Sequence, residues 1–166
     1  MGWILLIKVI ILKYLLVFLI SMVPLIELRG AVPAALTMGL DPIPAYIICV
    51  IGNMIPVPFI YFFARKVLLW GADKKFIGKF FTFCLEKGDK AGKKLVGTAG
   101  RGGLFVALML FVGIPLPGTG AWTGALGASF LNMGFKSTVA SVSLGVIIAG
   151  IIMGVASALG LHILGL

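Results

Sequence analysis

Apolar residues run along most of the chain, and short polar stretches divide them into segments. The first segment, residues 1–23, is interrupted by Lys8 and Lys13. Only 13 residues separate Lys13 from Glu27. As a helix they would extend about 20 Å, which is less than the roughly 30 Å of a bilayer core. We therefore expect an N-terminal helix that either crosses, with both lysines reaching one interface, or lies partly in that interface.

A polar motif breaks the apolar pattern at residues 24–41, where Glu27 and Arg29 lie between Pro24 and Pro33. Ionisable side chains are costly in a bilayer, and proline interrupts the helical hydrogen bonds. Irregular backbone is tolerated at membrane depth only when it is buried in protein or lines a wet cavity. The motif predicts a re-entrant helical hairpin over 24–41. The alternative is a short extramembrane loop between two helices.

The next segment, residues 42–64, is 23 residues long without a charge, which predicts a transmembrane helix. Near its centre Asn53 precedes Pro56 and Pro58. Both prolines remove a backbone donor, so carbonyl groups should be left free beside the Asn53 amide. This arrangement fits a binding site and fits equally a kinked helix whose asparagine bonds a neighbouring helix.

Residues 65–101 hold ten of the fourteen lysines and arginines, with three acidic residues. By the positive-inside rule this basic segment is cytoplasmic. Phe76, Phe80, Phe83 and Cys84 share one helical face within it. The pattern predicts an amphipathic helix on the membrane surface that contacts anionic lipid headgroups. A specific lipid or partner site is the less economical interpretation.

Residues 102–135 carry no charge over 34 positions. A single straight helix of that length would reach about 51 Å, whereas two full crossings with a turn need about 44 residues. A second re-entrant hairpin fits this length. Residues that break its helix or add polarity cluster at its centre; they are Pro115, Pro117, Gly118, Thr119, Gly120 and Trp122. Residues 136–166 then predict a last transmembrane helix, with Gly150 and Gly154 as a small-residue packing face.

The two halves share a pattern. Pro24-Leu25 is followed by Gly30-Ala31, and Pro115-Leu116 is followed by Gly120-Ala121. Each hairpin precedes one span, so a cytoplasmic 65–101 would give the halves opposite orientations. Inverted repeats of this kind are typical of secondary transporters. With 61% hydrophobic and 11% charged residues, we expect one membrane domain that is all-α.

Chemistry centres on Glu27, the one carboxylate inside an apolar segment. Burial disfavours its charged form and a nearby arginine favours it, so the group is suited to take up and release a proton. Arg29 stays charged and suits a carboxylate or phosphate. Two residues apart, they would not face each other on a helix. In an irregular tip they could face each other, or each could reach across to the other half. The alternative to a functional role is a structural ion pair that holds the tip.

The second hairpin offers weaker candidates. Gly118, Thr119 and Gly120 could present backbone amides and a hydroxyl to an anion. Trp122 could stack on a substrate, although packing is the simpler role. No nucleophile–base pair, metal-ligand cluster or nucleotide-binding loop stands out, so we expect no enzyme activity, cofactor or metal.

Three blocks resemble the signature of the putative small multidrug export protein family, in order and spacing along nearly the whole chain. They are Pro24-Leu-Ile-Glu-Leu-Arg-Gly-Ala-Val-Pro33, Gly52-Asn-Met-Ile-Pro-Val-Pro-Phe59 and Ile114-Pro-Leu-Pro-Gly-Thr-Gly-Ala-Trp-Thr-Gly124. That family is distantly similar to the DedA superfamily, which includes polyprenyl-phosphate and phospholipid translocases. The resemblance implies transport, with Glu27, Asp41 and Arg101 at positions that match functional residues. Unlike DedA proteins, this chain has no arginine inside its second hairpin.

Three hypotheses follow. The first is a proton-coupled secondary transporter or exporter of a small molecule that uses Glu27, Arg29 and Asn53. The second is a DedA-like lipid-phosphate translocase or scramblase. The third is a membrane scaffold that acts by oligomerising. In each case we expect a multi-pass protein of the cell membrane without a nucleic-acid partner, and the glycine faces favour a homodimer.

Overall fold

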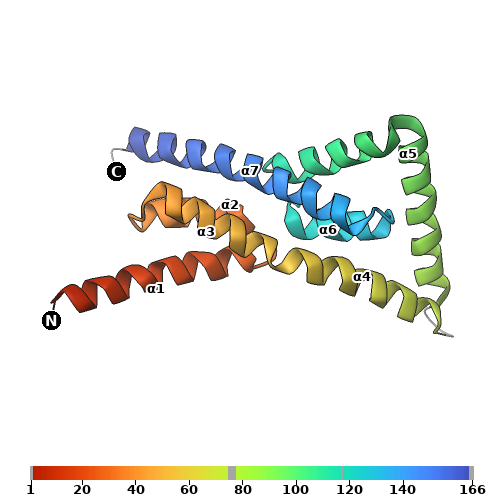
Figure 1. Cartoon of the computed structure of the whole chain (residues 1–166), viewed down its shortest axis with the longest axis horizontal. Coiled ribbons are helices and arrows are strands. Elements are labelled where there is room, and N and C mark those ends of the chain that lie inside the picture. The colour runs from red at the N-terminus through yellow and green to blue at the C-terminus, as the bar shows by residue number, and fades with distance from the viewer. Residues whose placement is uncertain (1, 75–77, 117, 165–166) are drawn as a thin grey trace.

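The computed structural model describes residues 2–74, 78–116 and 118–164. In these ranges helices are joined by short turns and loops, and there are no strands (Figure 1). Its helices are α1 (Gly2–Met22), α2 (Glu27–Thr37), α3 (Pro42–Met54), α4 (Pro56–Ala72), α5 (Gly78–Gly113), α6 (Ala121–Phe130) and α7 (Phe135–Leu164). The all-α class predicted from the sequence is confirmed.

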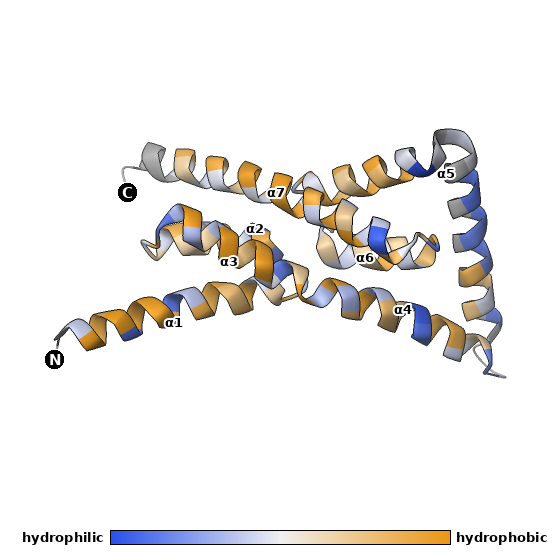
Figure 2. Cartoon of the chain, viewed as in Figure 1, coloured by the Kyte–Doolittle hydropathy of each residue, from blue (hydrophilic) through white to orange (hydrophobic). Residues whose placement is uncertain are grey.

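Three stretches are long and apolar enough to cross a membrane, namely Trp3–Met22, Pro42–Ala72 and Phe135–Gly160. Large apolar side chains on them are exposed, with Trp3 at 80% and Phe59 at 72%. Figure 2 shows hydrophobic residues along α1, α3 and α7. Such surfaces are stable in lipid rather than in water. The protein is therefore an integral membrane protein.

The first half is built on a hairpin of α1 and α2. Residues 23–26 form its tip, and α2 returns along α1 before α3 begins. At the open end, Lys13 Nζ donates a hydrogen bond of 2.8 Å to the carbonyl oxygen of Met38, at the C-terminus of α2. This arrangement differs from the sequence-based segments, which set residues 1–23 apart from a hairpin at 24–41. The 11 residues of α2 are too few to make both arms, so α1 supplies the other.

The predicted break in the second apolar segment lies at Ile55, between α3 and α4. Pro56 is the first residue of α4, a position where proline costs no helical hydrogen bond. The interruption is therefore a short turn rather than an unwound stretch. The helix α4 also continues to Ala72, beyond the predicted end at residue 64. Arg65 in this extension donates a hydrogen bond of 2.5 Å to Asn132 Oδ1.

Gly100, at φ 71° and ψ 175°, bends α5 into two arms. The first arm, residues 78–99, runs across the ends of the other helices, and the second arm, residues 101–113, returns toward the centre of the molecule (Figure 1). A positive φ costs glycine little, so the bend falls where the sequence allows it. It lies next to the predicted boundary between the basic segment 65–101 and the second hairpin.

The first arm of α5 carries much of the basic segment, and Figure 2 shows its hydrophilic residues. Phe83 is exposed, and Lys87 Nζ lies 5.5 Å from the centre of its ring. Phe76 lies outside the described residues, as do the side chains of Phe80 and Cys84. The apolar face predicted for this helix is therefore visible only in part.

The second half consists of the second arm of α5, a loop at 114–120, α6 and α7. Its turn after α6 repeats the turn after α2. Amides of Met38, Gly39 and Leu40 donate to the carbonyls of Ala34, Leu36 and Ala35, and those of Leu131, Asn132 and Met133 donate to Gly127, Ser129 and Ala128. Each group of the second set lies 93 positions after its counterpart in the first (131 − 38 = 93).

Two glycines at the same spacing allow close helix packing. A Cβ on Gly52 of α3 would lie 2.8 Å from the Phe18 carbonyl oxygen of α1. A Cβ on Gly145 of α7 would lie 2.7 Å from the Met109 carbonyl oxygen of α5. The third helix of each half thus packs tightly on the first.

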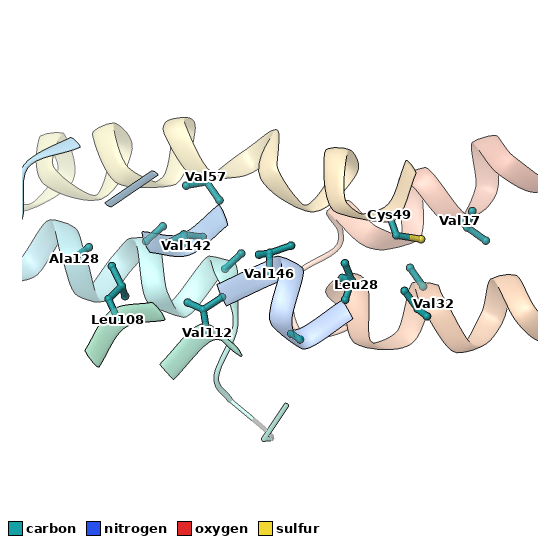
Figure 3. Close-up of a cluster of buried hydrophobic side chains, with 14 of the residues drawn as sticks. Val17, Leu28, Val32, Cys49, Val57, Leu108, Val112, Ala128, Val142 and Val146 are labelled. Carbon is teal, nitrogen blue, oxygen red and sulfur yellow. The ribbon is translucent and has the colours of Figure 1, made fainter. Parts of the chain in front are cut away.

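Buried side chains form one apolar core that extends through both halves (Figure 3). Val17 and Cys49 belong to the first half, and Leu108 and Val142 to the second. Figure 3 shows Leu28 and Val146 between these groups, where the two hairpin tips meet.

Candidate functional site

Glu27 begins α2 at the tip of the first hairpin, and only 4% of its surface is exposed. Its backbone has φ 49°, a left-handed conformation that non-glycine residues rarely adopt. The carboxylate accepts hydrogen bonds from the amides of Ala121, at 3.1 Å, and Trp122, at 3.0 Å. These are the first residues of α6, where helical amides lack partners and a negative charge is stabilised. The carboxylate therefore caps α6 from across the molecule.

Gly120 makes room for this contact. A Cβ at position 120 would lie 2.1 Å from Glu27 Oε2, and the backbone has φ 136°. A side chain is excluded on both counts, by the clash and by the conformation. The glycine predicted to matter as an anion-binding amide thus serves the site by being small.

Arg29 binds the loop of the second hairpin. One of its terminal nitrogens donates to the Leu116 carbonyl oxygen, and the other donates to Thr119 Oγ1 at 2.6 Å and approaches the Ile114 carbonyl at 3.4 Å. The Thr119 hydroxyl lies 2.9 Å from that same Ile114 oxygen. The planar guanidinium can hold several acceptors at fixed angles, which an ammonium group cannot. Arg29 therefore fixes the shape of the loop.

Of the arrangements left open by the sequence, the structure has the one in which each charged residue reaches across to the other half. Glu27 binds the start of α6 and Arg29 binds the loop before it. The hydrogen bonds join residues 85 to 95 positions apart. The two hairpins are therefore joined tip to tip by polar contacts inside an apolar molecule.

Asn53 lies beside these contacts with 2% of its surface exposed. Its Oδ1 atom has no hydrogen-bond partner among the described residues. A cavity of about 10 Å³ adjoins it. The lining residues are Glu27, Leu28, Arg29, Asn53, Val112, Gly120, Ala121, Val146 and Ala149. The structure thus places Asn53 with Glu27 and Arg29 around one cavity.

Asp41 and Arg101 lie elsewhere. Asp41 is exposed and precedes α3, whereas Asn53 lies in the last turn of that 13-residue helix, about 18 Å along its axis. Arg101 is exposed at the start of the second arm of α5 and lines a cavity of about 360 Å³ with Asn132 and Ser137. Neither residue contributes to the contact between the hairpins.

The predicted backbone breakers fall into three groups. Pro24 belongs to the tip at 23–26, whereas Gly30 and Pro33 lie within α2 and do not end it. Pro56 and Pro58 lie in the first turn of α4. Pro115, Gly118 and Thr119 belong to the loop at 114–120, and Pro117 lies outside the described residues.

Sequence reasoning missed the partners of the charged residues. The amides that bind Glu27 belong to Ala121 and Trp122 rather than to the Gly-Thr-Gly run before them. A loop that ends in glycine just before a helical segment is the signal that could have located them. Trp122 also buries its indole Nε1, which has no partner among the described residues.

These features define a class of protein, an all-α membrane protein in which two helical hairpins meet through ionisable side chains. The family model described as putative small multi-drug export protein matches residues 27–152, and the chain belongs to that family. The match begins at Glu27, directly after the first tip, and includes the loop of the second hairpin. No curated protein and no solved structure matches the chain. Membership indicates a membrane protein of the export type.

Proposed function

We propose that this protein is a proton-coupled secondary transporter of the cell membrane that exports small molecules. The observation that carries the proposal is the buried Glu27 carboxylate, which holds the start of α6 from the opposite hairpin. Buried ionisable groups in membrane proteins are costly and commonly mark the path of an ion or substrate.

Protonation of Glu27 would weaken this contact. The ionised carboxylate accepts two amide hydrogen bonds and is stabilised by the positive end of α6. A neutral carboxyl group loses that stabilisation, and the two tips can then separate. Arg29 stays charged and keeps the loop in shape through its three acceptors. Release of a proton from Glu27 would in this way close the contact between the tips, and uptake of a proton would open it.

The repeated turns after α2 and α6 support an alternating mechanism. So does the equivalent packing of Gly52 and Gly145. Transporters made of two inverted halves expose a central site to each side by rocking one half against the other. In this proposal the central site lies at the tips. The hairpin of α1 and α2 and the hairpin of the second α5 arm and α6 are re-entrant from opposite sides.

Proton flux in reconstituted liposomes tests the proposal. Vesicles that hold a pH-sensitive dye would receive the lipophilic cation ethidium on one side, followed by a panel of other charged amphipaths. We expect substrate-dependent proton movement with the wild type and a loss of at least tenfold with Glu27→Gln. Glu86→Gln, which alters an exposed carboxylate on α5, is the matched control and should transport normally. Equal flux in wild type and Glu27→Gln, or no flux with any compound, would refute the mechanism.

The basic segment 65–101 supports a cytoplasmic orientation for the C-terminus of α4 and the first arm of α5. We further propose that its first α5 arm rests on anionic lipid headgroups. Lys74 and Lys87 already lie over aromatic rings at 4.6 and 5.5 Å, so aromatic and basic groups are combined as at membrane surfaces. Thermal unfolding of the protein incorporated into nanodiscs with and without anionic lipid measures this, and equal stability in both would count against it.

A second candidate function, lipid-phosphate translocation, is favoured by a groove in the second hairpin. The polar cavity at Arg101 adjoins an apolar one of about 270 Å³ between α5 and α6, because Leu104, Leu131 and Met133 line both. A cationic cavity beside an apolar one suits an anionic head with a lipid tail. If lipids move here, Arg101→Ala should slow lipid flipping in liposomes while Lys90→Ala should not. Absence of flipping by the wild type would reject this candidate.

A further inference from the structure

The cavity next to Asn53 has the dimensions for one small occupant. Its volume is about 10 Å³, close to the smallest space that holds a water molecule. Its polar walls come from Glu27, Arg29 and Asn53, which belong to α2 and α3. Leu28 and Val146 supply apolar walls and are buried. A drug-sized molecule cannot enter without opening the tips.

The orphaned oxygen of Asn53 indicates what the occupant must provide. A buried carbonyl oxygen without a donor is unfavourable, and nearly all such groups are satisfied by protein or by ordered water. The occupant therefore needs a hydrogen to donate. It also meets the Glu27 carboxylate, a second acceptor, and the Arg29 guanidinium, a donor.

Charge selects among small occupants. Glu27 and Arg29 are the ionisable residues of the lining, and their charges cancel. A metal cation would add an uncompensated positive charge beside the guanidinium in an apolar surrounding, which is costly. Water is neutral and can donate two hydrogen bonds while accepting one. Its donors and acceptors match the three polar groups of the wall.

We propose that a single water molecule occupies this cavity, bridges Asn53 Oδ1 and the Glu27 carboxylate, and relays protons to that carboxylate. Asn53 is a positioning residue in this scheme, because it acts through the water. An excess proton that reaches the water passes to the carboxylate oxygen and leaves a neutral water and a neutral carboxyl group. The relay role rests on the proposed proton coupling, whereas the bound water does not.

The two halves differ at this position. Asn53 in α3 corresponds at the 93-residue spacing to Val146 in α7, and both line the cavity. The same holds for Glu27 and Gly120. Polar groups thus come from the first half and apolar or small groups from the second. The water's hydrogen-bond partners in the wall therefore all belong to the first half.

Infrared difference spectroscopy on the purified protein tests the inference. Spectra recorded at acidic minus neutral pH should contain a carboxyl band that is absent in Glu27→Gln. They should also contain a water O–H stretching band that shifts when heavy-oxygen water replaces ordinary water. We expect Asn53→Leu to abolish the water band, since it removes the acceptor and fills the space.

A second variant guards against misfolding of the first. Ala149→Val adds methyl groups to the cavity wall and leaves Asn53 in place, so it should also remove the water band. Val142→Ala, a core change on the same helix that does not line this cavity, should keep it. A wild type without an isotope-sensitive water band, or an Asn53→Leu or Ala149→Val variant that retains it, overturns the inference. If Glu27→Gln still abolishes proton flux in that case, the proposed transport function stands without the water.

Discussion

Glu27 and Gly120 form a contact in which the carboxylate occupies the space of a missing side chain. A Cβ on Gly120 would lie 2.1 Å from the carboxylate, whereas one on Gly118 would meet none of the described atoms within 4 Å. Both glycines have positive φ, at 136° and 81°. Alanine at 118 would therefore introduce backbone strain alone, whereas alanine at 120 would introduce both strain and a clash with Glu27.

Gly120→Ala should lower the melting temperature in detergent far more than Gly118→Ala. Each change introduces backbone strain of about 1–3 kcal/mol. Gly120→Ala also displaces the carboxylate from the amides of Ala121 and Trp122. Thermal unfolding of both variants, followed by intrinsic fluorescence, makes the comparison. Equal shifts would mean that the Glu27 contact contributes little to stability.

Arg29→Lys tests the shape of the guanidinium at constant charge. Lysine offers one nitrogen in place of the fork that contacts Leu116, Ile114 and Thr119. We expect the variant to lose about 1.5–3 kcal/mol of stability, the value of a hydrogen bond to a charged group. Lys66→Arg, at an exposed site on α4, serves as the reverse control and should change nothing measurable. Wild-type stability in Arg29→Lys would show that charge alone suffices.

The charged residues of the site could be predicted from the sequence, because ionisable groups within apolar segments are rare. Their partners could not. Ala121 and Trp122 contribute backbone amides, which every residue possesses, and they lie 94 and 95 positions from Glu27. Asp41 and Arg101 were included for their charge and the family resemblance, but they lie away from the contact. This could not be predicted either, because the sequence does not show which ends of the helices meet.

At the scale of elements, glycine determines how closely helices pack. Gly145 on α7 lies against the Met109 carbonyl and Val112 of α5, and Gly150 lies against the ring of Tyr46. Gly154 on the same helix has nothing within 4 Å of the Cβ position. Of the small-residue face predicted at 150 and 154, Gly150 alone makes a close helix contact with the described residues.

Gly145→Ala should therefore destabilise the second half and Gly154→Ala should not. The added methyl group at 145 would lie 2.7 Å from backbone and force α5 and α7 apart. Differential scanning fluorimetry of the two variants measures the contrast. A similar loss of stability in Gly145→Ala and Gly154→Ala would contradict the packing argument.

The predicted homodimer can use Gly154, so Gly154→Leu should lower the dimer fraction in mass photometry.

The boundaries of helices could be predicted from the sequence where glycine or proline determines the backbone conformation. The bend at Gly100 and the loop at 114–120 are such places. The pairing of α1 with α2 could not be predicted in this way. It depends on which apolar surface α1 packs against, and the hydrophobic residues of α1 face all directions, so their pattern selects no face.

At the scale of the whole molecule, the turn at Asp41 and the first arm of α5 lie at opposite ends of the α3–α4 pair (Figure 1). In a membrane these ends should face opposite compartments. In a background without Cys49 and Cys84, Asp41→Cys should react with an impermeant maleimide from outside only, and Lys90→Cys from inside only. Labelling of both from one side would exclude the crossing of α3–α4. Labelling of each from the other side would invert the proposed orientation.

The contact between the tips also bears on how the protein is made. The hydrogen-bond partners described for the Glu27 and Arg29 side chains lie in residues 114–122, which leave the ribosome after some 90 more residues have been synthesised. Until then both side chains lack those partners, and burial would leave their charges uncompensated. The first hairpin must therefore remain hydrated, or shielded by the insertion machinery, and settle late. A chain truncated before the second hairpin would carry these charges permanently exposed to lipid, which makes it a natural substrate for membrane quality control.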